Sequence, residues 1–410
     1  MIPRTVLSSI EESIRFKPVT LVTGARQVGK TTLCQLIAEK HGFGYVSLAT
    51  GSERAVAMRD PEMFLRLHPS PVIIDEVQYA PGLFDAIEGI VDARKFETGR
   101  NAGMYILTGS QVYRLMEGVT QSMAGRVGII HMSPLSMSEI LGREERPFVV
   151  DFESNIRRAS EHVLSVDDVY GMIVRGMYPE LYDRPDMRTS TFYSDYVDTY
   201  IERDVSEMIA LKDKLKFRQF MEYLASMTGQ ELVNDSIAGA IGVSVHTVQS
   251  WLGVLVAGGI VRLLQPYFER SNVSRVVKRP KVYFCDTGLA CYLARIFAAQ
   301  TLRVGYLGGH MVETFIVNEI MKTYSNNTEE AGFYYYRDAE KREVDLLILR
   351  NARLSLIECK AGMTYDSTDV RAFSRLDKSD YEVGPSCLIC LTDRAYPLKP
   401  GVYALPISSI

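Results

Sequence analysis

Short apolar runs alternate with helical stretches over the first third of the chain. Five runs rich in β-branched and aliphatic side chains favour strands, at residues 19–23, 44–48, 71–75, 104–108 and 128–132. The sequence between these runs is patterned as helices, and strands separated by helices are typical of a parallel sheet with helices on its faces. We therefore expect an α/β domain over residues 1–133.

The pattern changes after this first domain. From residue 134 to 229 apolar residues recur at helical spacing, which predicts a helical region. Residues 230–286 are patterned as short helices followed by a β-hairpin. Residues 287–410 are patterned as helices followed by strands, at 333–336, 344–349, 354–359 and 387–391. These changes predict domain boundaries near residues 134, 230 and 287.

Composition narrows the class of protein. The 410 residues include 46 Lys and Arg against 50 Asp and Glu, a formal net charge of −4, so nucleic-acid binding needs a local basic patch. Hydrophobic residues make up 47% of the chain, which excludes global disorder. The longest apolar or glycine run, residues 251–261, is shorter than the ~20 residues that span a bilayer, and the first residues contain no apolar secretory segment. Because the six cysteines are also scattered, we expect a cytoplasmic protein with no membrane partner.

A glycine-rich phosphate motif follows the first predicted strand. Residues 24–31 read GARQVGKT and fit G-x-x-x-x-G-K-[ST], with an apolar strand before them and a helix after them. Glycines let consecutive backbone N–H groups surround phosphate oxygens, while Lys30 reaches the outer phosphates and the Thr31 hydroxyl binds Mg²⁺. The expected ATP-binding residues are Gly24, Ala25, Arg26, Gln27, Val28, Gly29, Lys30, Thr31 and Thr32.

Two carboxylates end the third predicted strand. Residues 72–74 are apolar, and Asp75 and Glu76 follow them in the pattern of a Walker B strand. We expect Asp75 to hold Mg²⁺ and Glu76 to polarise the attacking water. The next strand ends in Thr108, Gly109 and Ser110, whose hydroxyls suit a polar sensor of the γ-phosphate, although a capped turn would use the same residues.

These motifs together resemble a known family. The chain contains, in this order, GARQVGKTTL, VIIDEVQ, ILTGSQ, SMAGRV and PLSMSEIL. This series resembles a family of bacterial and archaeal AAA-type ATPases with a C-terminal domain of unknown function, and the resemblance covers nearly the whole chain. It implies a parallel P-loop sheet whose sensor strand lies between the Walker B strand and the P-loop strand. For the helical region at residues 134–229, the structural role that we expect is a lid over the nucleotide.

The resemblance adds polar and basic residues to the catalytic site. Gln78 lies just past the acidic pair, and Arg126 is the basic residue of the GR motif. An arginine near the γ-phosphate stabilises the charge of the transition state. The sequence leaves open whether Arg126 serves its own subunit or a neighbour in a homo-oligomer, and a surface ion pair is the alternative. Arg203 is a further candidate sensor, for which ion pairing between helices is the favoured interpretation.

Residues 232–251 are patterned as a helix-turn-helix, and the hairpin after them resembles the wing of a winged helix. Six basic residues in and around this hairpin suit contacts with DNA phosphates: Arg262, Arg270, Arg275, Lys278, Arg279 and Lys281. The candidate base readers are His246, Thr247 and Gln249. Winged helices also serve as packing modules, so DNA binding is one of two interpretations.

Four residues of the last segment resemble a nuclease site. Glu313 lies on a predicted helix and Asp345 on a predicted strand. Glu358 and Lys360 alternate on the next strand, so they share one face. Asp345 and Glu358 would hold a divalent metal while Lys360 orients the water. This D…E-x-K pattern resembles the restriction-endonuclease-like fold, with Glu313 matching its helix acid, and a binding domain that kept the fold without activity is the alternative.

The leading hypothesis is a Mg²⁺-dependent AAA-type ATPase coupled to a winged helix and a nuclease-like module that acts on DNA. One alternative is a nucleotide-gated switch that binds DNA or a protein partner without hydrolysing ATP and whose nuclease fold is inactive. Another is a metal-dependent DNA endonuclease that ATP regulates. The sequence identifies neither the biological substrate nor the oligomeric state.

Overall fold

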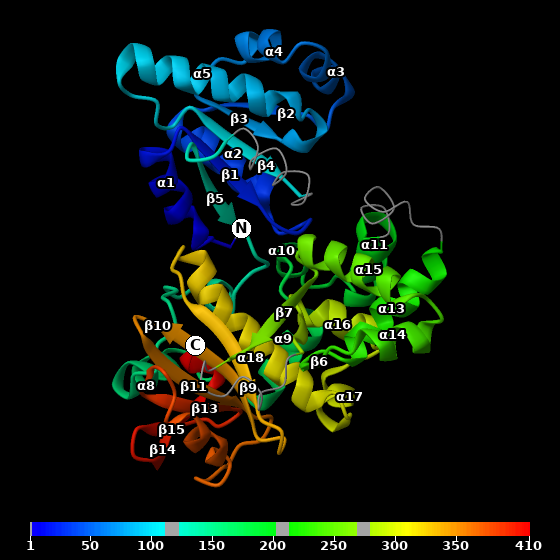
Figure 1. The fold of residues 1–410 in the computed structure, drawn as a ribbon, viewed down its shortest axis with the longest axis vertical. Helices are drawn as coiled ribbons and strands as arrows, with labels where there is room; N and C mark the ends of the chain where they lie inside the picture. Colours follow the sequence, from blue (N-terminus) through cyan, green and yellow to red (C-terminus); the bar gives the residue numbers. More distant parts are fainter. Residues whose placement is uncertain (1, 111–122, 202–212, 269–278) are drawn as a thin grey trace. The chain divides into compact units, whose positions relative to one another are not determined.

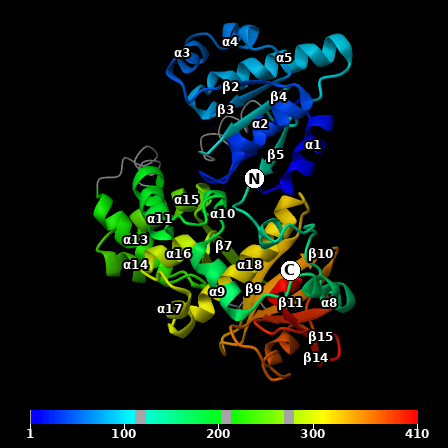
Figure 2. The ribbon, with the colours of Figure 1, turned by 180° about the vertical axis from the view of Figure 1, so that it is seen from behind.

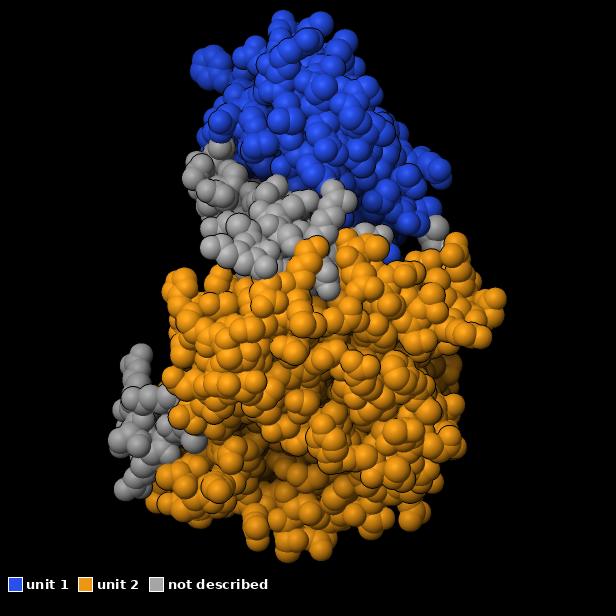
Figure 3. All heavy atoms as spheres, turned by 90° about the vertical axis from the view of Figure 1, so that its right-hand side faces the viewer, with its two compact units in different colours: residues 1–135, 257–259, 325–328 blue, residues 136–256, 260–324, 329–410 orange. Residues whose placement is uncertain are grey.

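The computed structural model describes residues 2–110, 123–201, 213–268 and 279–410. The chain divides into two compact units, which Figure 3 shows in different colours. Unit 1 contains residues 1–135 with the short segments 257–259 and 325–328. Unit 2 contains residues 136–256, 260–324 and 329–410. The candidate residues lie within these units, so each unit is described separately.

Unit 1 is built on a five-stranded parallel sheet in the order β2-β3-β4-β1-β5. Its strands are β1 (Val19–Thr23), β2 (Gly44–Ser47), β3 (Val72–Asp75), β4 (Tyr105–Gly109) and β5 (Val127–His131). Its helices are α1 (Val6–Phe16), α2 (Lys30–His41), α3 (Gly51–Arg59), α4 (Pro61–Leu67) and α5 (Gly82–Thr98), with a 3₁₀ turn at Val77–Tyr79. The predicted α/β class, the five strands and the place of the sensor strand β4 between β3 and β1 are confirmed (Figure 1).

The central strands of this sheet are buried on both faces. Ile73 and Ile74 are neighbours on β3 and are both fully buried, although successive strand residues point to opposite faces. This burial explains why the strands read as continuous apolar runs, as parallel strands between helices do. Ile74 belongs to the same core as Leu83 and Ile87 of α5, so the helix after β3 covers one of the two faces.

Unit 2 begins with a mainly helical region. Its helices up to the second sheet are α7 (Met137–Ile140), α8 (Phe152–Glu161), α9 (Val166–Arg175), α10 (Pro179–Asp183), α11 (Thr189–Tyr196), the π-helix Val197–Ile201 and α13 (Lys214–Ser226). Phe192 and Tyr196 of α11 are buried with Tyr178, whose hydroxyl donates to that of Tyr196 at 2.9 Å. The helical periodicity of this region therefore corresponds to helices with a shared aromatic core.

Two helices meet at a glycine in the region expected to form a helix-turn-helix. They are α14 (Asn234–Ile241) and α15 (Val245–Ala257). Gly242 ends α14 at φ 71°, and the Ser244 hydroxyl accepts from the backbone N–H of Thr247 at the start of α15. Across the described residues no single helix has the length and apolarity to cross a membrane; α14 and α15 pass that test only as a pair, and they are bent by 106°.

The second sheet has ten strands and joins segments far apart in the sequence. Its path is β14-β15-β13-β11-β10-β9-β7-β8-β6, with β12 beside β11. The strands are β6 (Gln230–Glu231), β7 (Val261–Pro266), β8 (Lys281–Phe284), β9 (Gly332–Arg337), β10 (Glu343–Arg350), β11 (Arg353–Cys359), β12 (Glu382–Val383), β13 (Ser386–Cys390), β14 (Tyr396–Lys399) and β15 (Val402–Pro406). The strands expected near 333, 344, 354 and 387 are confirmed, whereas β14 and β15 were not predicted.

One pairing in this sheet was not expected from the sequence. The hairpin strand β7 pairs in parallel with β9, which places the hairpin and the C-terminal strands in one sheet. The remaining helices of the unit are α16 (Thr287–Leu293), α17 (Ala299–Val304) and α18 (Gly308–Asn326). Helix α18 lies against β9, where the ring centroids of Tyr324 and Phe333 are 5.2 Å apart. Figure 2 shows the ribbon from behind, with α18 and β9 labelled. The hairpin and the C-terminal segment thus share one framework.

Candidate functional site

The phosphate motif forms the connection between β1 and α2. Its glycines have positive φ angles, 145° at Gly24 and 95° at Gly29, which side chains rarely adopt. At Gly24 an added Cβ would also overlap the backbone carbonyl of Met132. Gln27 takes a positive φ of 60° without being glycine. The loop therefore has the tight, strained turn that brings backbone groups close to a ligand.

Lys30 is buried inside this loop, with 7% of its surface exposed. Its Nζ donates hydrogen bonds to the carbonyl oxygens of Gly24 at 3.0 Å and Ala25 at 2.7 Å. Burial lowers the pKa of Lys30 from 10.5 to about 8, although Glu76 and Asp75 act in the opposite direction. The cation is thus held by neutral carbonyls and its charge is only partly balanced.

Asp75 connects the P-loop with the neighbouring strands. It is buried, and Oδ2 accepts hydrogen bonds from Thr31 Oγ1 at 3.2 Å and from Tyr45 OH at 2.8 Å. Its Oδ1 accepts from Thr108 Oγ1. Tyr45 was not singled out from the sequence, where it is an ordinary strand residue. Its place on β2, the strand that pairs in parallel with β3, is the signal that could have identified it.

Glu76 has a left-handed backbone, with φ 59° and ψ 44°. Such a conformation is costly for a residue other than glycine and concentrates at functional sites. Oε2 of Glu76 accepts from Gln78 Nε2 and lies 3.5 Å from Ser110 Oγ, while the backbone N–H of Glu76 lies 3.4 Å from Thr108 Oγ1. The structure therefore brings together the predicted residues Lys30, Asp75 and Glu76 with their polar neighbours.

These residues meet because three parallel strands end at the same edge of the sheet. Thr23 at the end of β1 pairs with Gly109 at the end of β4, and β3 lies on the other side of β4. The start of α2 at this edge adds backbone donors and positive potential, which suit phosphate groups. The Thr31 hydroxyl and the Asp75 carboxylate provide hard oxygen ligands, so the donor set fits Mg²⁺.

Arg4 also contacts the P-loop and was not predicted. Its guanidinium donates to the carbonyl oxygen of Val28 at 2.6 Å and to that of Ser133 at 2.7 Å. The contact ties the loop to the chain after β5. Arg4 lies far from the motif in sequence, and no feature of the sequence marked it.

Arg126 lies at the opposite edge of the sheet from the P-loop. It directly precedes β5, which runs parallel to β1, and its carbonyl accepts from the backbone N–H of Val19 at the start of β1. The four residue steps along β1 cover roughly 13 Å, more than a side chain bridges. Its guanidinium pairs with Asp92 at 2.7 Å and with Glu88 at 3.0 Å on α5. The structure thus does not bring Arg126 to the P-loop of its own subunit.

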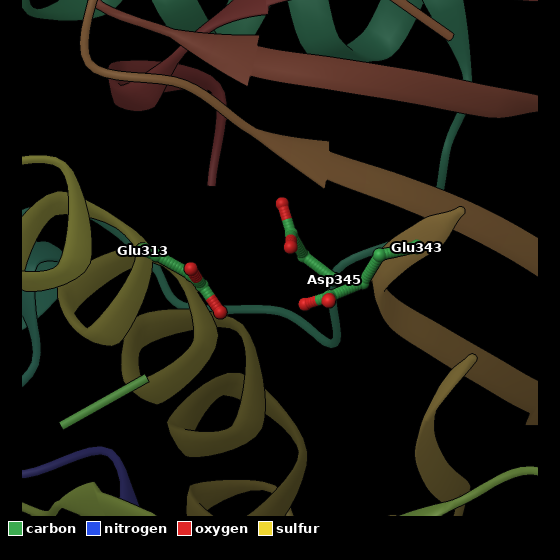
Figure 4. Close-up of side chains that lie close together, drawn as sticks. All are labelled: Glu313, Glu343 and Asp345. Carbon is green, nitrogen blue, oxygen red and sulfur yellow. The ribbon is translucent and has the colours of Figure 1, made fainter. Parts of the chain in front are cut away.

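A second group of charged residues gathers in unit 2. Lys281 at the start of β8 is 2% exposed, and its Nζ lies 2.8 Å from Glu313 Oε1 and 3.5 Å from Asp345 Oδ1. It also forms an ion pair with Glu343. One carboxylate oxygen from each of Glu313, Glu343 and Asp345 lies within 4.8 Å of the others, and we call these three residues the carboxylate cluster (Figure 4). Glu343 was not predicted, although it stands two residues from Asp345 on the same strand.

The burial of Lys281 corrects one prediction. The sequence interpretation placed Lys281 on a basic surface for DNA phosphates, but its side chain is enclosed by carboxylates and cannot reach a phosphate. Of the other basic residues predicted to contact DNA, Arg262 is half-buried with a contact to the Met321 sulfur, and Arg279 is exposed. Arg270, Arg275 and Lys278 lie outside the described residues, as does Arg203, the other candidate sensor. His246 and Gln249 are exposed on α15, and Thr247 is half-buried.

Glu358 and Lys360 lie beside the carboxylate cluster. Their side chains form an ion pair, although β11 ends at Cys359, so that Lys360 directly follows the strand on which it was expected. The backbone N–H of Cys359 donates to Asp345 Oδ2 at 2.9 Å, so β11 carries Glu358 next to Asp345. Burial, and then the charge of Asp345, raises the pKa of Glu358 well above its usual range, although Lys360 lowers it. Glu358 Oε2 is buried and has no hydrogen-bond partner within the described part of the chain.

Electrostatics in the carboxylate cluster are dominated by burial and by mutual charge. Burial raises the pKa of Glu313 from 4.5 to about 7, with Asp345 raising it further and Lys281 lowering it. Burial by itself would lower the pKa of Lys281, but Glu313 and the other anions around it raise that pKa well above its usual value. Tyr283 donates to Glu313 Oε1 at 2.6 Å. Of the predicted residues, Glu313 and Asp345 therefore contact a lysine from another segment, and Glu358 and Lys360 lie beside Asp345.

Comparison with protein families divides the chain into three matched segments. Residues 16–141 match the family described as AAA domain. Residues 166–300 and 308–410 match two families described as domains of unknown function, DUF8612 and DUF4143. Two mycobacterial relatives, uncharacterized protein Mb2031c of Mycobacterium bovis and uncharacterized protein Rv2008c of Mycobacterium tuberculosis, are each 25% identical over 411 positions, which cover 99% of this chain and 84% of theirs.

Solved structures give more distant similarities. The Walker-type ATPase PABY2304 of Pyrococcus abyssi is 14% identical and aligns over 70% of this chain and 94% of its own, with a TM-score of 0.42. A point variant of RuvB from Thermotoga maritima is 15% identical and aligns over 64% of this chain and 89% of its own, with a TM-score of 0.30. The chain thus joins a P-loop segment that matches AAA domains to a C-terminal segment that matches the DUF4143 family.

Proposed function

We propose that unit 1 binds ATP with Mg²⁺ and hydrolyses it at the edge where β1, β3 and β4 end. The observation that carries this proposal is the hydrogen bond between Thr31 Oγ1 and Asp75 Oδ2, because it joins the P-loop helix to the Walker B strand. These are the two side chains that would hold Mg²⁺. Bound Mg²⁺ neutralises charge on the transferred phosphoryl oxygens.

Each residue of the site has a specific role in this proposal. The backbone of residues 24–32 binds the phosphates, and Lys30 exchanges its carbonyl partners for the outer phosphates. Glu76 accepts a proton from the attacking water. Gln78 and Ser110, whose polar atoms face Glu76 Oε2, orient that carboxylate or the water. Thr108 and Tyr45 hold Asp75 in place.

The test is the substitution Glu76→Gln. It keeps the size of the side chain but removes the base, so we expect bound Mg·ATP and turnover slowed by roughly 10²–10⁴. Steady-state phosphate release measures turnover, and calorimetry measures binding. Glu62→Gln is the matched control, because Glu62 is an exposed acid of the same unit outside the site. Undiminished phosphate release by Glu76→Gln would refute the assigned base.

Arg126 requires a neighbouring subunit if it acts on ATP. Its place at the far edge of the sheet supports action in trans, and the pairs with Asp92 and Glu88 support a structural ion pair instead. Mixing two inactive variants separates these roles. Lys30→Ala and Arg126→Ala subunits together would regain part of the phosphate release when each supplies what the other lacks. An Arg126→Ala variant with full activity would leave only the ion pair.

For unit 2 we propose a winged-helix segment over residues 230–286 and a nuclease-like module over 287–410, with a helical lid over 134–229. The gathering of Glu313, Asp345, Glu358 and Lys360 supports a metal-dependent phosphodiester site. Arg262, Arg279 and the exposed face of α15 are the described candidates for DNA contact. Plasmid cleavage with Mg²⁺ or Mn²⁺ that is lost in Asp345→Ala, while phosphate release continues, would support nuclease activity.

The second candidate function is a nucleotide-gated switch without turnover. The ion pairs of Lys281 favour the inactive nuclease fold of this alternative, because an ammonium group already balances the carboxylate cluster. Phosphate release measured with and without DNA decides between the two functions. Release at the background rate under both conditions, together with tight ATP binding, would favour the switch.

A further inference from the structure

Lys281 has the surroundings of a bound cation. Three carboxylates from two elements approach its Nζ: Glu313 from α18, and Glu343 and Asp345 from β10. The side chain is 2% exposed, so water does not share in balancing the charge. Figure 4 shows Glu313 extending from the helix, and Glu343 and Asp345 from the strand, into the space between the two elements. The ammonium group therefore lies where a cation bound by the carboxylate cluster would lie.

The same oxygens also suit a divalent metal ion. Hard cations such as Mn²⁺ and Mg²⁺ take oxygen ligands, and one oxygen of each residue in the carboxylate cluster lies within 4.8 Å of the others. A single position between these oxygens has no room for both a metal ion and an ammonium group. We propose that the ammonium group of Lys281 occupies the cation position of the carboxylate cluster, so that a divalent metal ion binds there only when Lys281 is withdrawn. This inference rests on the metal site proposed above.

Glu358 provides a second, independent observation that points to a metal ligand. Its Oε2 is buried and has no hydrogen-bond partner among the residues that the structure describes. A buried carboxylate oxygen without a partner is costly, and Lys281 makes no contact that relieves it. Since β11 places Glu358 beside Asp345, this oxygen is available as a further ligand at the edge of the carboxylate cluster. The site thus keeps one unused ligand while the lysine is in place.

Lys281 comes from a different part of the chain than the acids that hold it. It lies on β8, which pairs with β6 and β7 next to the α14–α15 helices. The matched segment 166–300 contains Lys281, whereas 308–410 contains the whole carboxylate cluster. A ligand that shifts β8 would therefore expose the acids to metal. The contact connects the proposed winged helix with the proposed metal site.

Calorimetric titration with Mn²⁺ tests the proposal on the full, nucleotide-free chain. Every arm carries Asp75→Asn, which removes the metal carboxylate of the P-loop. Lys281→Met removes one positive charge at contact distance, so we expect Mn²⁺ to bind at least about ten-fold more tightly than in the Lys281 chain. Adding Glu313→Gln and Asp345→Asn to Lys281→Met removes the ligands and should abolish this binding.

Lys322→Met is the matched control. Lys322 is also buried and lies on α18, and it pairs at 2.7 Å with Glu319, which is not a member of the carboxylate cluster. We expect the Mn²⁺ affinity of this variant to equal that of the chain that carries Asp75→Asn alone. If Lys281→Met does not fold, Lys281→Gln replaces it, because glutamine keeps a hydrogen-bond donor for Glu313. The thermal unfolding temperature, followed by Trp251 fluorescence, supplies a second readout. We expect it to rise when Mn²⁺ is added to Lys281→Met or to Lys281→Gln.

The outcomes separate this inference from the metal site on which it rests. Equal Mn²⁺ affinity with and without Lys281 would overturn the role of Lys281 and leave the metal site standing. No Mn²⁺ binding in any arm would overturn the metal site and the inference with it. Tighter binding in Lys281→Met that survives removal of Glu313 and Asp345 would place the metal elsewhere and overturn both.

Discussion

Lys30 in unit 1 and Lys281 in unit 2 are both buried beside carboxylates, yet their charges are balanced in different ways. Lys30 donates to two neutral carbonyls of its own loop, and the nearby acids act on it only at longer range. Lys281 makes ion pairs with three carboxylates. The pKa of Lys30 is accordingly lowered to about 8, and that of Lys281 is raised well above its usual value.

This difference shows which lysine is prepared for an anionic ligand. A buried cation with few compensating charges is unfavourable, and a phosphate group would relieve it. A buried cation that is already surrounded by acids gains nothing from an added phosphate. Lys30 therefore suits ligand binding, whereas Lys281 suits either structure or the exclusion of another cation.

The largest expected difference between the two lysines is the effect of their removal on the stability of unit 2. Lys281→Met leaves the buried acids Glu313 and Asp345 and the half-buried Glu343 without their cation, so we expect the free energy of unfolding of unit 2 to fall by about 3–5 kcal/mol. Trp251, the single tryptophan of the chain, is buried in unit 2 against Phe217 and Phe220 and reports this transition in urea. Lys30→Met changes unit 1, so the Trp251 transition should stay where it is.

If Lys281→Met and Lys30→Met have the same effect on the Trp251 transition, the two lysines do not differ as we propose. A Trp251 transition unchanged by Lys281→Met would mean that the three acids are not held as the geometry suggests, for example because Glu313, whose pKa is raised, takes up a proton. Repeating the titration at pH 5 and pH 8 detects that uptake, since protonated acids need no cation.

The P-loop site could be predicted because its chemistry is local in sequence. Residues 24–31 carry the motif, and Asp75 and Glu76 directly follow an apolar strand. Parallel strands end at one edge of a sheet, so the meeting of these residues follows from the strand order. The same reasoning applied to Arg126 would have placed it at the other edge, because it precedes its strand rather than following it.

The carboxylate cluster and the residues beside it could be predicted only in part. The D…E-x-K spacing identified Asp345, Glu358 and Lys360, because neighbouring strands and period-two alternation are readable in sequence. Lys281 was misplaced because its burial depends on the parallel pairing of β7 with β9, strands that are about 70 residues apart and have no pattern that specifies a partner. A basic residue in a hairpin then looks like a surface charge.

The affinity for ATP should depend on pH through Lys30. A pKa of about 8 means that Lys30 loses its proton as the pH rises, and only the protonated form pairs with phosphate. We expect ATP affinity to fall about ten-fold between pH 7 and pH 9 relative to Lys30→Ala. The ratio of the two affinities, measured by calorimetry in EDTA, removes the titration of ATP itself. A ratio that does not change with pH would mean that Lys30 remains charged in the loop, as Lys281 does in the carboxylate cluster.

Substitution of Glu313 has the smallest expected effect, and it tests the carboxylates that pair with Lys281. Its pKa of about 7 in the folded chain lies above the ordinary 4.5, so folding favours the protonated form. The stability that this proton contributes is fully present below pH 4.5 and is lost as the pH rises through 7.

Glu313→Gln has no proton to lose, so the difference in unfolding free energy between the unsubstituted chain and this variant should decline from pH 5 to pH 8. The rise in the pKa of Glu313 from 4.5 to about 7 sets an upper limit of about 3 kcal/mol on this decline. We expect a decline of about 1 kcal/mol, because movement of Lys281, Tyr283 and Asp345 around Glu313 screens its charge. Urea titrations followed by Trp251 fluorescence at four pH values measure it. His310, whose pKa is lowered by burial, is present in both proteins, so its contribution to the difference cancels. A difference that is constant across this range would show that Lys281 keeps Glu313 ionised at every pH, which would make the ion pairs around Lys281 stronger than the comparison with Lys30 assumes.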